Sequence, residues 1–320
     1  MKAKINRLLS IILPLSLGLG LTFWSYNSFS DSQLAQMKNY FVSANYNYVL
    51  LSIFFAILGY VLRAYRWKYT LQQINCTPNF KLNFLAVCIG YFVNLSVPRA
   101  GEVSRALILK KYQNQPFDKV FGTIISERIY DLIILLLFIT VSLIIEFRTL
   151  KDFLLLHIPI GKLILLTGIG FACFLMFLYF YLYSQWQFIV LLKSKIQGLK
   201  EGALSVFNMK NKTPFFVYTI LIWLSYVITF YTTTFALDAT SGISLGTCLV
   251  AFVIGSLTIT FTNGGFGFFP ILIAKILLLY NIPIEAGNAF GWIIWTSQLL
   301  ITVVLGIFAF LVVPFVVKNK

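Results

Sequence analysis

Charged residues are scarce in this chain. Only 11% of its 320 residues are Asp, Glu, Lys or Arg, whereas 59% are hydrophobic. The mean hydropathy of +0.86 is too high for a soluble domain, which cannot hide that much apolar surface. The apolar runs also lack the period-two alternation of strands, which argues against an outer-membrane barrel. The composition therefore predicts an all-α polytopic membrane protein.

Residues that carry metal and acid–base chemistry are also few. His157 is the only histidine, and the four cysteines, Cys76, Cys88, Cys173 and Cys248, share no CxxC-type spacing. We therefore expect no metal, no cofactor and no disulfide. The sequence also lacks a DxD motif, a GxSG motif with a usable histidine, an HExxH motif and a GK[ST] nucleotide loop. These absences favour a transporter over an enzyme, although they leave an enzyme open.

Six apolar runs are long enough to cross ~30 Å of hydrocarbon. They lie near 8–26, 46–66, 120–145, 161–184, 214–236 and 286–317. Two further regions, 82–109 and 244–280, consist of shorter apolar halves joined by a Pro- or Gly-containing break. The lysine-bearing segments 66–81 and 110–119 flank the first region, whereas little positive charge surrounds the second. By the positive-inside rule, the first enters and leaves from the cytoplasm and the second from outside.

The predicted fold is therefore six crossings plus two opposed re-entrant hairpins, in a single integral domain of residues 1–320. Residues 46–145 and 214–317 form the two halves of an inverted repeat, an architecture that many transporters share. Residues 185–213 mix apolar residues with lysines, which predicts a cytoplasmic amphipathic helix. We expect multi-pass insertion in the cytoplasmic membrane, with both termini in the cytoplasm. The alternative is eight ordinary transmembrane helices.

The candidate site is a set of charged residues at or beside these apolar runs. Its members are Arg63, Arg66, Arg99, Glu102, Arg105, Glu127, Arg128 and Asp131. An ionised side chain at the centre of a membrane helix costs ~3 kcal/mol or more unless it is paired or faces water. Arg99, Glu102 and Arg105 recur every three residues, so we expect them on one helix face with Glu102 bridging its neighbours. Arg128 can point to a neighbouring helix.

The charges allow two interpretations. In the first, arginines and carboxylates pair off and only lock the first hairpin to its neighbours. In the second, the excess of arginines over carboxylates leaves two positive charges for a phosphate, which arginine grips in a bidentate manner. Pro98 and Gly101 would add free N–H groups at the start of a helix.

The second break contains Asn263, Gly264, Gly265 and Gly267. Glycine permits close backbone approach, and irregular backbone at membrane depth either lines a cavity or is buried in protein. We expect this break to meet the first one near the middle of the membrane and to bound a cavity with it. A role in packing alone is the alternative.

Together these residues resemble the membrane region of lysylphosphatidylglycerol synthase/flippase proteins and their stand-alone flippase-like relatives. The matching pattern is Asn94, Pro98, Arg99, Gly101, Glu102 and Arg105, then Glu127, Arg128 and Asp131, and finally the glycines at 264–267. The resemblance covers residues 45–315. It departs from the family at Phe268, Phe269 and Pro270, where a glutamate often stands, and at Lys320, where the chain ends without the soluble aminoacyl-transferring domain.

The resemblance implies translocation of a lipid or lipid-linked anionic headgroup across the cytoplasmic membrane, and it does not imply lysyl transfer. The expected partners are membrane lipids, either anionic phospholipids or lipid-linked intermediates, together with a lipid-modifying enzyme. Asn94 joins the expected headgroup site. We expect no nucleic-acid partner, because the net charge of +15 is concentrated in loops as the positive-inside rule requires. The alternative function is an integral membrane enzyme or an accessory subunit of envelope glycolipid or phospholipid synthesis.

Overall fold

The structure is a computed structural model. It describes residues 16–97, 99–149, 151–152, 160–184, 186–187, 189–190, 193, 206, 209, 212–262 and 264–318. Most of the expected amphipathic helix at 185–213, and the start of the expected crossing at 8–26, lie outside the described residues. Residues 16–28 of that crossing are helical.

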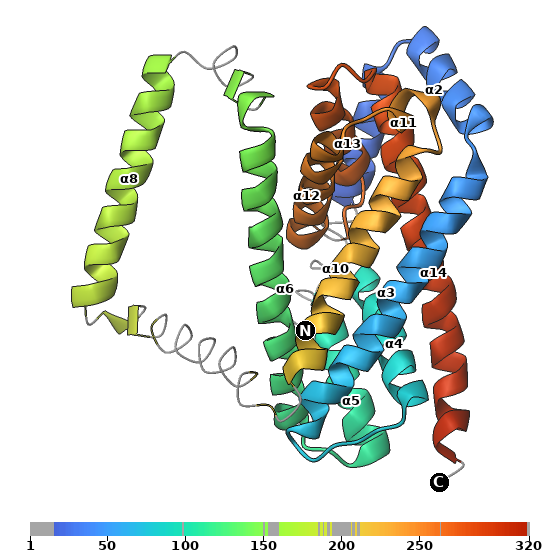
Figure 1. The fold of residues 1–320 in the computed structure, drawn as a ribbon, viewed down its shortest axis with the longest axis vertical. Helices are drawn as coiled ribbons and strands as arrows, with labels where there is room; N and C mark the ends of the chain where they lie inside the picture. The colour runs from blue at the N-terminus through green and yellow to red at the C-terminus, as the bar shows by residue number, and fades with distance from the viewer. Residues whose placement is uncertain are drawn as a thin grey trace.

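The described residues fold into helices (Figure 1). In chain order these are α2 (Asp31–Ser43), α3 (Tyr46–Gln72), α4 (Phe80–Ser96), α5 (Ala100–Gln113), α6 (Phe117–Ile145), α8 (Ile160–Tyr183), α10 (Lys212–Thr234), α11 (Asp238–Ser241), α12 (Leu245–Phe261), α13 (Phe268–Leu278) and α14 (Ile284–Lys318). Polar residues cap several of the starts. Asn45, Asn79 and Ser244 each accept a backbone N–H from the first turn of α3, α4 and α12.

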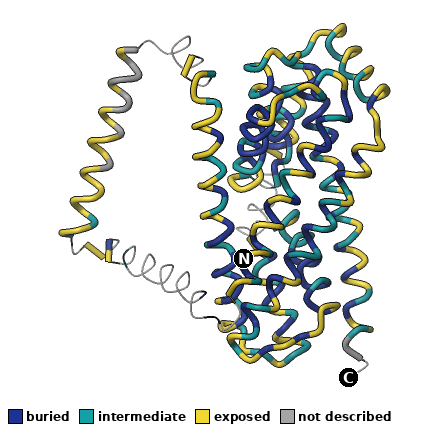
Figure 2. Tube along the Cα trace, in the orientation of Figure 1, coloured by how far each residue is buried: buried dark blue, intermediate teal, exposed yellow. Residues whose placement is uncertain are grey.

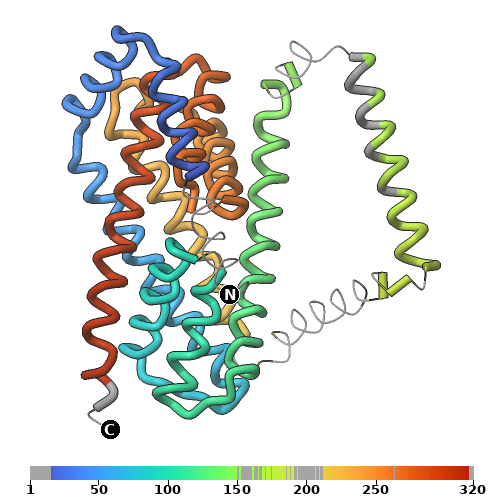
Figure 3. The backbone as a smooth tube through the Cα atoms, turned by 180° about the vertical axis from the view of Figure 1, so that it is seen from behind, coloured from blue at the N-terminus to red at the C-terminus, as the bar shows by residue number. Residues whose placement is uncertain are grey.

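Four helices in the described part are long and apolar enough to cross a membrane: α3, α6, α10 and α14. They confirm the prediction of an all-α polytopic membrane protein. The helix α3 continues six residues past the expected end of its run at residue 66, because Trp67, Thr70 and Leu71 in this added segment are buried. The helix α8, of 24 residues, stands apart from the others in both views (Figures 1 and 3).

The two broken regions form two helix pairs, which we call the first helix pair (α4–α5) and the second helix pair (α12–α13). Their helices have 17, 14, 17 and 11 residues. At 1.5 Å per residue each spans ~26 Å or less, short of the ~30 Å hydrocarbon core. The bases of the two pairs lie at opposite ends of the molecule, and their tips approach its middle (Figure 1). A Cβ placed on Gly264 would lie 3.8 Å from Cδ2 of Leu95, so the tips are neighbours.

The core divides between the two ends (Figure 2). One cluster of buried residues joins the second helix pair to α10 and α14 around Phe252, Phe269 and Phe290. A second cluster joins the first helix pair to α3, α6 and α14 around Trp67 and Leu109. The helix α14 contributes to both clusters, so it connects the two ends of the molecule.

Candidate functional site

Seven of the eight predicted charged residues come together between α3, α5 and α6, whereas Arg99 makes no ion pair with them. Asp131 on α6 lies at the centre of this cluster. Its carboxylate accepts hydrogen bonds from Nη1 of Arg63 at 2.9 Å and from Nη1 of Arg66 at 2.7 Å. Nη1 of Arg128, one turn earlier on the same helix, lies 3.5 Å away. Three arginines therefore surround one carboxylate.

Glu127 extends the cluster one turn along α6 and is almost completely buried, with 1% of its surface exposed. It accepts a hydrogen bond from Nη2 of Arg105 at 2.9 Å, and Nε of Arg66 lies 3.5 Å from its other oxygen. The Arg105 guanidinium also stacks on the Trp67 ring, 4.0 Å from its centroid. Arg105 thus joins α5 to both α6 and α3. We call Arg63, Arg66, Arg105, Glu127 and Asp131 the inner cluster.

The pairing of Glu102 differs from the sequence prediction. Glu102 bridges neither Arg99 nor Arg105; its Oε1 instead lies 2.8 Å from Nη2 of Arg128 on α6. The reason is the packing of α5 against α6, which places an arginine of the next helix opposite Glu102. A contact along one helix face, worth only ~0.2–0.5 kcal/mol, is displaced by this ion pair. Arg128 does point to a neighbouring helix, as predicted.

The Arg128–Glu102 pair forms the open edge of the cluster. The Arg128 side chain is 35% exposed and that of Glu102 is 15% exposed, whereas the inner arginines are at most 6% exposed. Oε2 of Glu102 and Nε of Arg128 have no hydrogen-bond partner among the described residues. Both atoms are buried, and Nε of Arg66, Nε of Arg105 and Oε1 of Glu127 are unpaired in the same way, so the edge is distinguished by the exposed surface of the Arg128 side chain.

A tyrosine pair that the sequence analysis missed links the inner cluster to α10 and α4. Nε of Arg63 donates to the Tyr226 hydroxyl at 2.5 Å, and this hydroxyl lies 3.0 Å from that of Tyr91. Nη1 of Arg66 also lies 3.3 Å from Oγ1 of Thr219, again on α10. Tyr226 and Thr219 are polar residues inside a crossing, which is the only local signal that could have identified them.

The tip of the first helix pair is shaped by Arg99 and Asn94. Arg99 immediately precedes α5 in the left-handed region, with φ of +62°, and is exposed. A non-glycine residue there is costly and often marks a functional position. The side-chain oxygen of Asn94 accepts the backbone N–H of Gly101 at 2.7 Å, and a side chain at Gly101 would collide with the backbone of Gly90. Gly101 therefore serves close packing of α5 on α4. Pro98 lies outside the described residues.

The tip of the second helix pair is held by packing. Gly264, Gly265 and Gly267 have φ of +66°, +80° and +75°. The carbonyl of Gly264 accepts a hydrogen bond from Nε1 of Trp295 on α14 at 2.8 Å. A Cβ at Gly267 would collide with the backbone of Gly18, so helix 16–28 lies directly against this tip. Asn263 lies outside the described residues.

Comparison with known proteins gives one family. The sequence profile described as "Lysylphosphatidylglycerol synthase TM region" matches residues 11–306. The chain is 35% identical over 100 residues to a UPF0104 membrane protein of Methanocaldococcus jannaschii, over 30% of each chain. It is 27% identical over 164 residues to a UPF0104 membrane protein of Pyrococcus horikoshii, over 50% of this chain and 47% of the relative. The matches thus span less than half of either relative, and no solved structure matches the chain.

Proposed function

Because the chain belongs to the family of the lysylphosphatidylglycerol synthase TM region, we propose that it moves an anionic lipid, or a lipid-linked anionic headgroup, across the cytoplasmic membrane. The observation that carries this proposal is the contrast between the inner cluster and its open edge. Arg128 keeps exposed surface beside buried arginines that are already engaged by carboxylates, and Arg99 is exposed three residues before Glu102, the partner of Arg128. A phosphate at this edge would meet two guanidinium groups.

The inner cluster acts as a structural lock in this proposal. Arg63, Arg66 and Arg105 are buried and each contacts a buried carboxylate. Removing one partner of such a pair costs ~3–5 kcal/mol, because it strands a charge away from water. The inner cluster holds the first helix pair against α3 and α6. In this proposal only the Arg128–Glu102 pair at the open edge exchanges partners when a ligand binds.

The open edge supplies the headgroup site. Arg99 makes no ion pair within the described residues and lies one turn before Glu102, whose only ionic partner there is Arg128. The cluster with Arg99 holds five arginines and three carboxylates, which leaves two positive charges. A phosphate can therefore displace Glu102 from Arg128 without breaking any contact of the inner cluster.

The two helix pairs complete the proposed mechanism as re-entrant hairpins between six crossings, in a single domain of residues 1–320 with an inverted repeat over 46–145 and 214–317. Their short helices, opposed bases and neighbouring tips support this topology. Lys81, Lys110 and Lys111 near the base of the first helix pair favour a cytoplasmic position for that base and for both termini. A headgroup bound at Arg99 would thus lie near the point where the two tips meet.

The test is lipid translocation by the purified full chain in vesicles of phosphatidylglycerol and phosphatidylcholine. Movement of an acyl-labelled fluorescent phosphatidylglycerol between leaflets is followed by dithionite quenching. Arg99→Gln should slow this movement at least tenfold, because a hydrogen bond to a charged group contributes ~1.5–3 kcal/mol. Lys119→Gln, which removes an exposed cation at the start of α6, is the matched control and should leave the rate unchanged.

Two results would argue against the proposal. If labelled phosphatidylcholine and phosphatidylglycerol move equally fast and Arg99→Gln has no effect, the open edge is not a headgroup site. If the lipid changes mass during incubation with the wild-type protein, the alternative of an envelope-lipid enzyme is favoured instead.

A further inference from the structure

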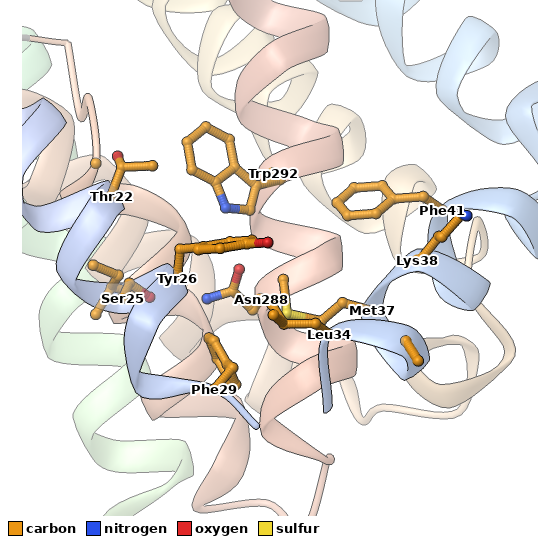
Figure 4. Close-up of a pocket in the computed structure, with 13 residues that line it drawn as sticks. Thr22, Ser25, Tyr26, Phe29, Leu34, Met37, Lys38, Phe41, Asn288 and Trp292 are labelled. Carbon is orange, nitrogen blue, oxygen red and sulfur yellow. The ribbon is translucent and has the colours of Figure 1, made fainter. Parts of the chain in front are cut away.

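Two pockets lie toward the end of the molecule that is opposite the C-terminus (Figure 1). The larger, of about 600 Å³, joins Lys38 of α2 to Asn288 of α14 and is lined mainly by apolar and aromatic side chains (Figure 4). The smaller, of about 490 Å³, is lined by polar residues and lies at the base of the second helix pair, between the end of α6, α11, the start of α12 and the loop from α13 to α14. We call the smaller one the basal pocket. Its volume is in the range of small-molecule sites, ~300–1,000 Å³.

The Glu146 carboxylate, just after α6, connects the walls of the basal pocket. Its Oε2 accepts a hydrogen bond from the Thr149 hydroxyl at 3.0 Å. A Cβ placed on Gly246 would collide with its Oε1, so the carboxylate lies directly against the first turn of α12. The Ser244 hydroxyl caps the same helix by accepting the backbone N–H of Thr247 at 3.0 Å. These contacts shape the pocket before any ligand arrives.

Tyr280 brings an unused hydrogen-bond donor to the basal pocket, which it lines. Burial and the nearby Glu146 carboxylate raise the pKa of the Tyr280 phenol, so the hydroxyl keeps its proton at physiological pH. This hydroxyl is nevertheless buried without a well-formed hydrogen bond to any described residue. Because buried polar groups are nearly always hydrogen-bonded, an acceptor that is not part of the described chain is expected to complete the pocket.

Gly242 leaves space in the lining of the basal pocket. Its φ of −92° is open to any residue, and a Cβ placed on it would meet no atom within 4 Å. Neither backbone geometry nor packing therefore requires glycine at this position, in contrast to Gly246. The missing side chain of Gly242 instead keeps the pocket open.

The charge and size of the basal pocket disfavour both anions and bare metal ions. Asp238 is the one charged residue among the described residues of the lining, and neither it nor Glu146 forms a salt bridge in the described part of the chain. Two carboxylates without a cation repel a phosphate or another carboxylate. A metal ion would fill little of the volume, and the described residues contain no group of three or more His, Cys, Asp or Glu side chains that could hold one.

The polar groups of the lining match a ligand that carries several hydroxyl groups. The Asp238 carboxylate can accept hydrogen bonds from two neighbouring hydroxyls, the Asn281 amide can both donate and accept, and the Tyr280 hydroxyl can donate. Asp238 and Asn281 are exposed, so a ligand can reach both. A sugar ring presents neighbouring hydroxyl groups in a rigid arrangement.

We propose that the basal pocket binds a small carbohydrate, either as a free sugar or as the headgroup of a glycolipid. The topology proposed above places this pocket on the outer side of the membrane, so the carbohydrate comes from outside the cell. The site goes beyond the proposed function, because it lies at the base of the second helix pair and uses none of the arginines near the first tip.

The test is saturation-transfer difference NMR of the full chain in phosphatidylcholine nanodiscs. Maltoside detergents are avoided because their sugar headgroup would compete. Glucose, galactose, mannose, N-acetylglucosamine and maltose are titrated separately, and at least one should bind with a dissociation constant in the millimolar range or below. Gly242→Trp should abolish this binding by filling the pocket, while thermal unfolding stays as in the wild type because its Cβ has free space.

Two milder variants keep the test decisive if Gly242→Trp unfolds. Asp238→Asn should weaken sugar binding about tenfold or more, because it removes a charged acceptor. Asn281→Gly removes the amide but keeps the backbone, since glycine adopts φ of +61° without strain, and should weaken binding about fivefold. Asp31→Asn, at an exposed carboxylate in the first turn of α2 outside the pocket, is the matched control and should change nothing.

Absence of saturation transfer to every sugar of the panel would overturn the inference, as would unchanged binding by a folded Gly242→Trp. Binding of ethanolamine or Ca²⁺ in place of the sugars would overturn it too, because the carboxylates would then serve a cation. Displacement of the free sugar by a glucosyl diacylglycerol added to the nanodiscs would support the inference with a glycolipid as the source, and binding without such displacement would support it with a free sugar. Arg99→Gln should leave sugar binding unchanged, so failure of the proposed function would not affect this result.

Discussion

The first and second helix pairs each consist of two short helices joined by a break, but different interactions hold them in place. The first carries Arg99, Glu102 and Arg105; two ion pairs fix it to α6, and the stacking of Arg105 on Trp67 fixes it to α3. The second has Lys275 as its one charged residue and is fixed by packing, with glycine backbone against helix 16–28 and a tryptophan hydrogen bond from α14. Both contain a backbone break, yet only the first has charged residues directly after the break, because Lys275 lies in the last turn of α13.

This difference suggests a division of labour between the two tips. Ion pairs can exchange partners when a charged ligand arrives, because the competing contacts are of the same kind. Backbone packed against backbone has no alternative partner, since protein interiors are close-packed and deform little. We therefore expect the first tip to respond to the headgroup and the second to serve as a rigid wall. The following predictions test this contrast, from the largest expected effect on stability to the smallest.

Asp131→Asn should have the largest effect. The change removes the charge that Arg63, Arg66 and Arg128 surround, so the free energy of unfolding should fall by at least ~3–5 kcal/mol. Thermal unfolding in detergent, followed by loss of the monodisperse peak, measures this. Asp118→Asn, at an exposed position of the same helix, should change stability by no more than ~0.5 kcal/mol. Equal effects of the two variants would show that the inner cluster is not a lock.

Gly267→Ala should have the next largest effect. The new Cβ would collide with the backbone of Gly18 and would also occupy a left-handed conformation, which costs ~1–2 kcal/mol by itself. Gly264→Ala carries the same conformational cost but has free space, with its nearest neighbour, Cδ2 of Leu95, at 3.8 Å. Thermal unfolding should therefore show a clearly larger loss for Gly267→Ala. If Gly264→Ala is the worse of the two, the tip does not pack on helix 16–28 as described.

Asn94→Ala and Trp295→Phe compare the hydrogen bonds that hold the two tips. Each variant removes a bond to the backbone, at Gly101 or at Gly264, and should lower stability by ~1 kcal/mol. Only Asn94→Ala should also slow movement of phosphatidylglycerol, because it loosens the start of α5 beside Arg99. A larger transport defect in Trp295→Phe would contradict the proposed division of labour.

Arg99→Gly should have the smallest effect on stability. Unlike the variants above, it should not destabilise the protein. Glycine adopts φ of +62° without the penalty that arginine has, so stability should stay the same or rise by up to ~1 kcal/mol. Transport should fall as it does for Arg99→Gln. A strained residue whose removal stabilises the protein and abolishes activity is retained for function. A loss of stability in Arg99→Gly would instead show that Arg99 has a structural partner.

The amino-acid sequence by itself determined the class of protein, the family and the composition of the candidate site. Long apolar runs leave no alternative to membrane helices, because every backbone polar group must be satisfied within the segment. The short apolar halves of the regions 82–109 and 244–280 likewise predicted two helix breaks. In the structure α4 ends at Ser96 before α5 begins at Ala100, and α12 ends at Phe261 before α13 begins at Phe268. The cost of charges at membrane depth made Arg63 to Asp131 a candidate cluster, and the structure joins these residues by ion pairs, with the exception of Arg99.

Only the tertiary structure determines which charged residues form ion pairs with one another. The spacing of Arg99, Glu102 and Arg105 fixes only a shared helix face, and the actual partner of Glu102 lies on the next helix. Arg63 and Tyr226 are 163 residues apart, and no local pattern relates them. The same holds for Gly267, which packs on Gly18, and for the cavity that joins Lys38 to Asn288. Ion pairing and packing depend on distances between helices, and those distances are set by how the whole chain folds.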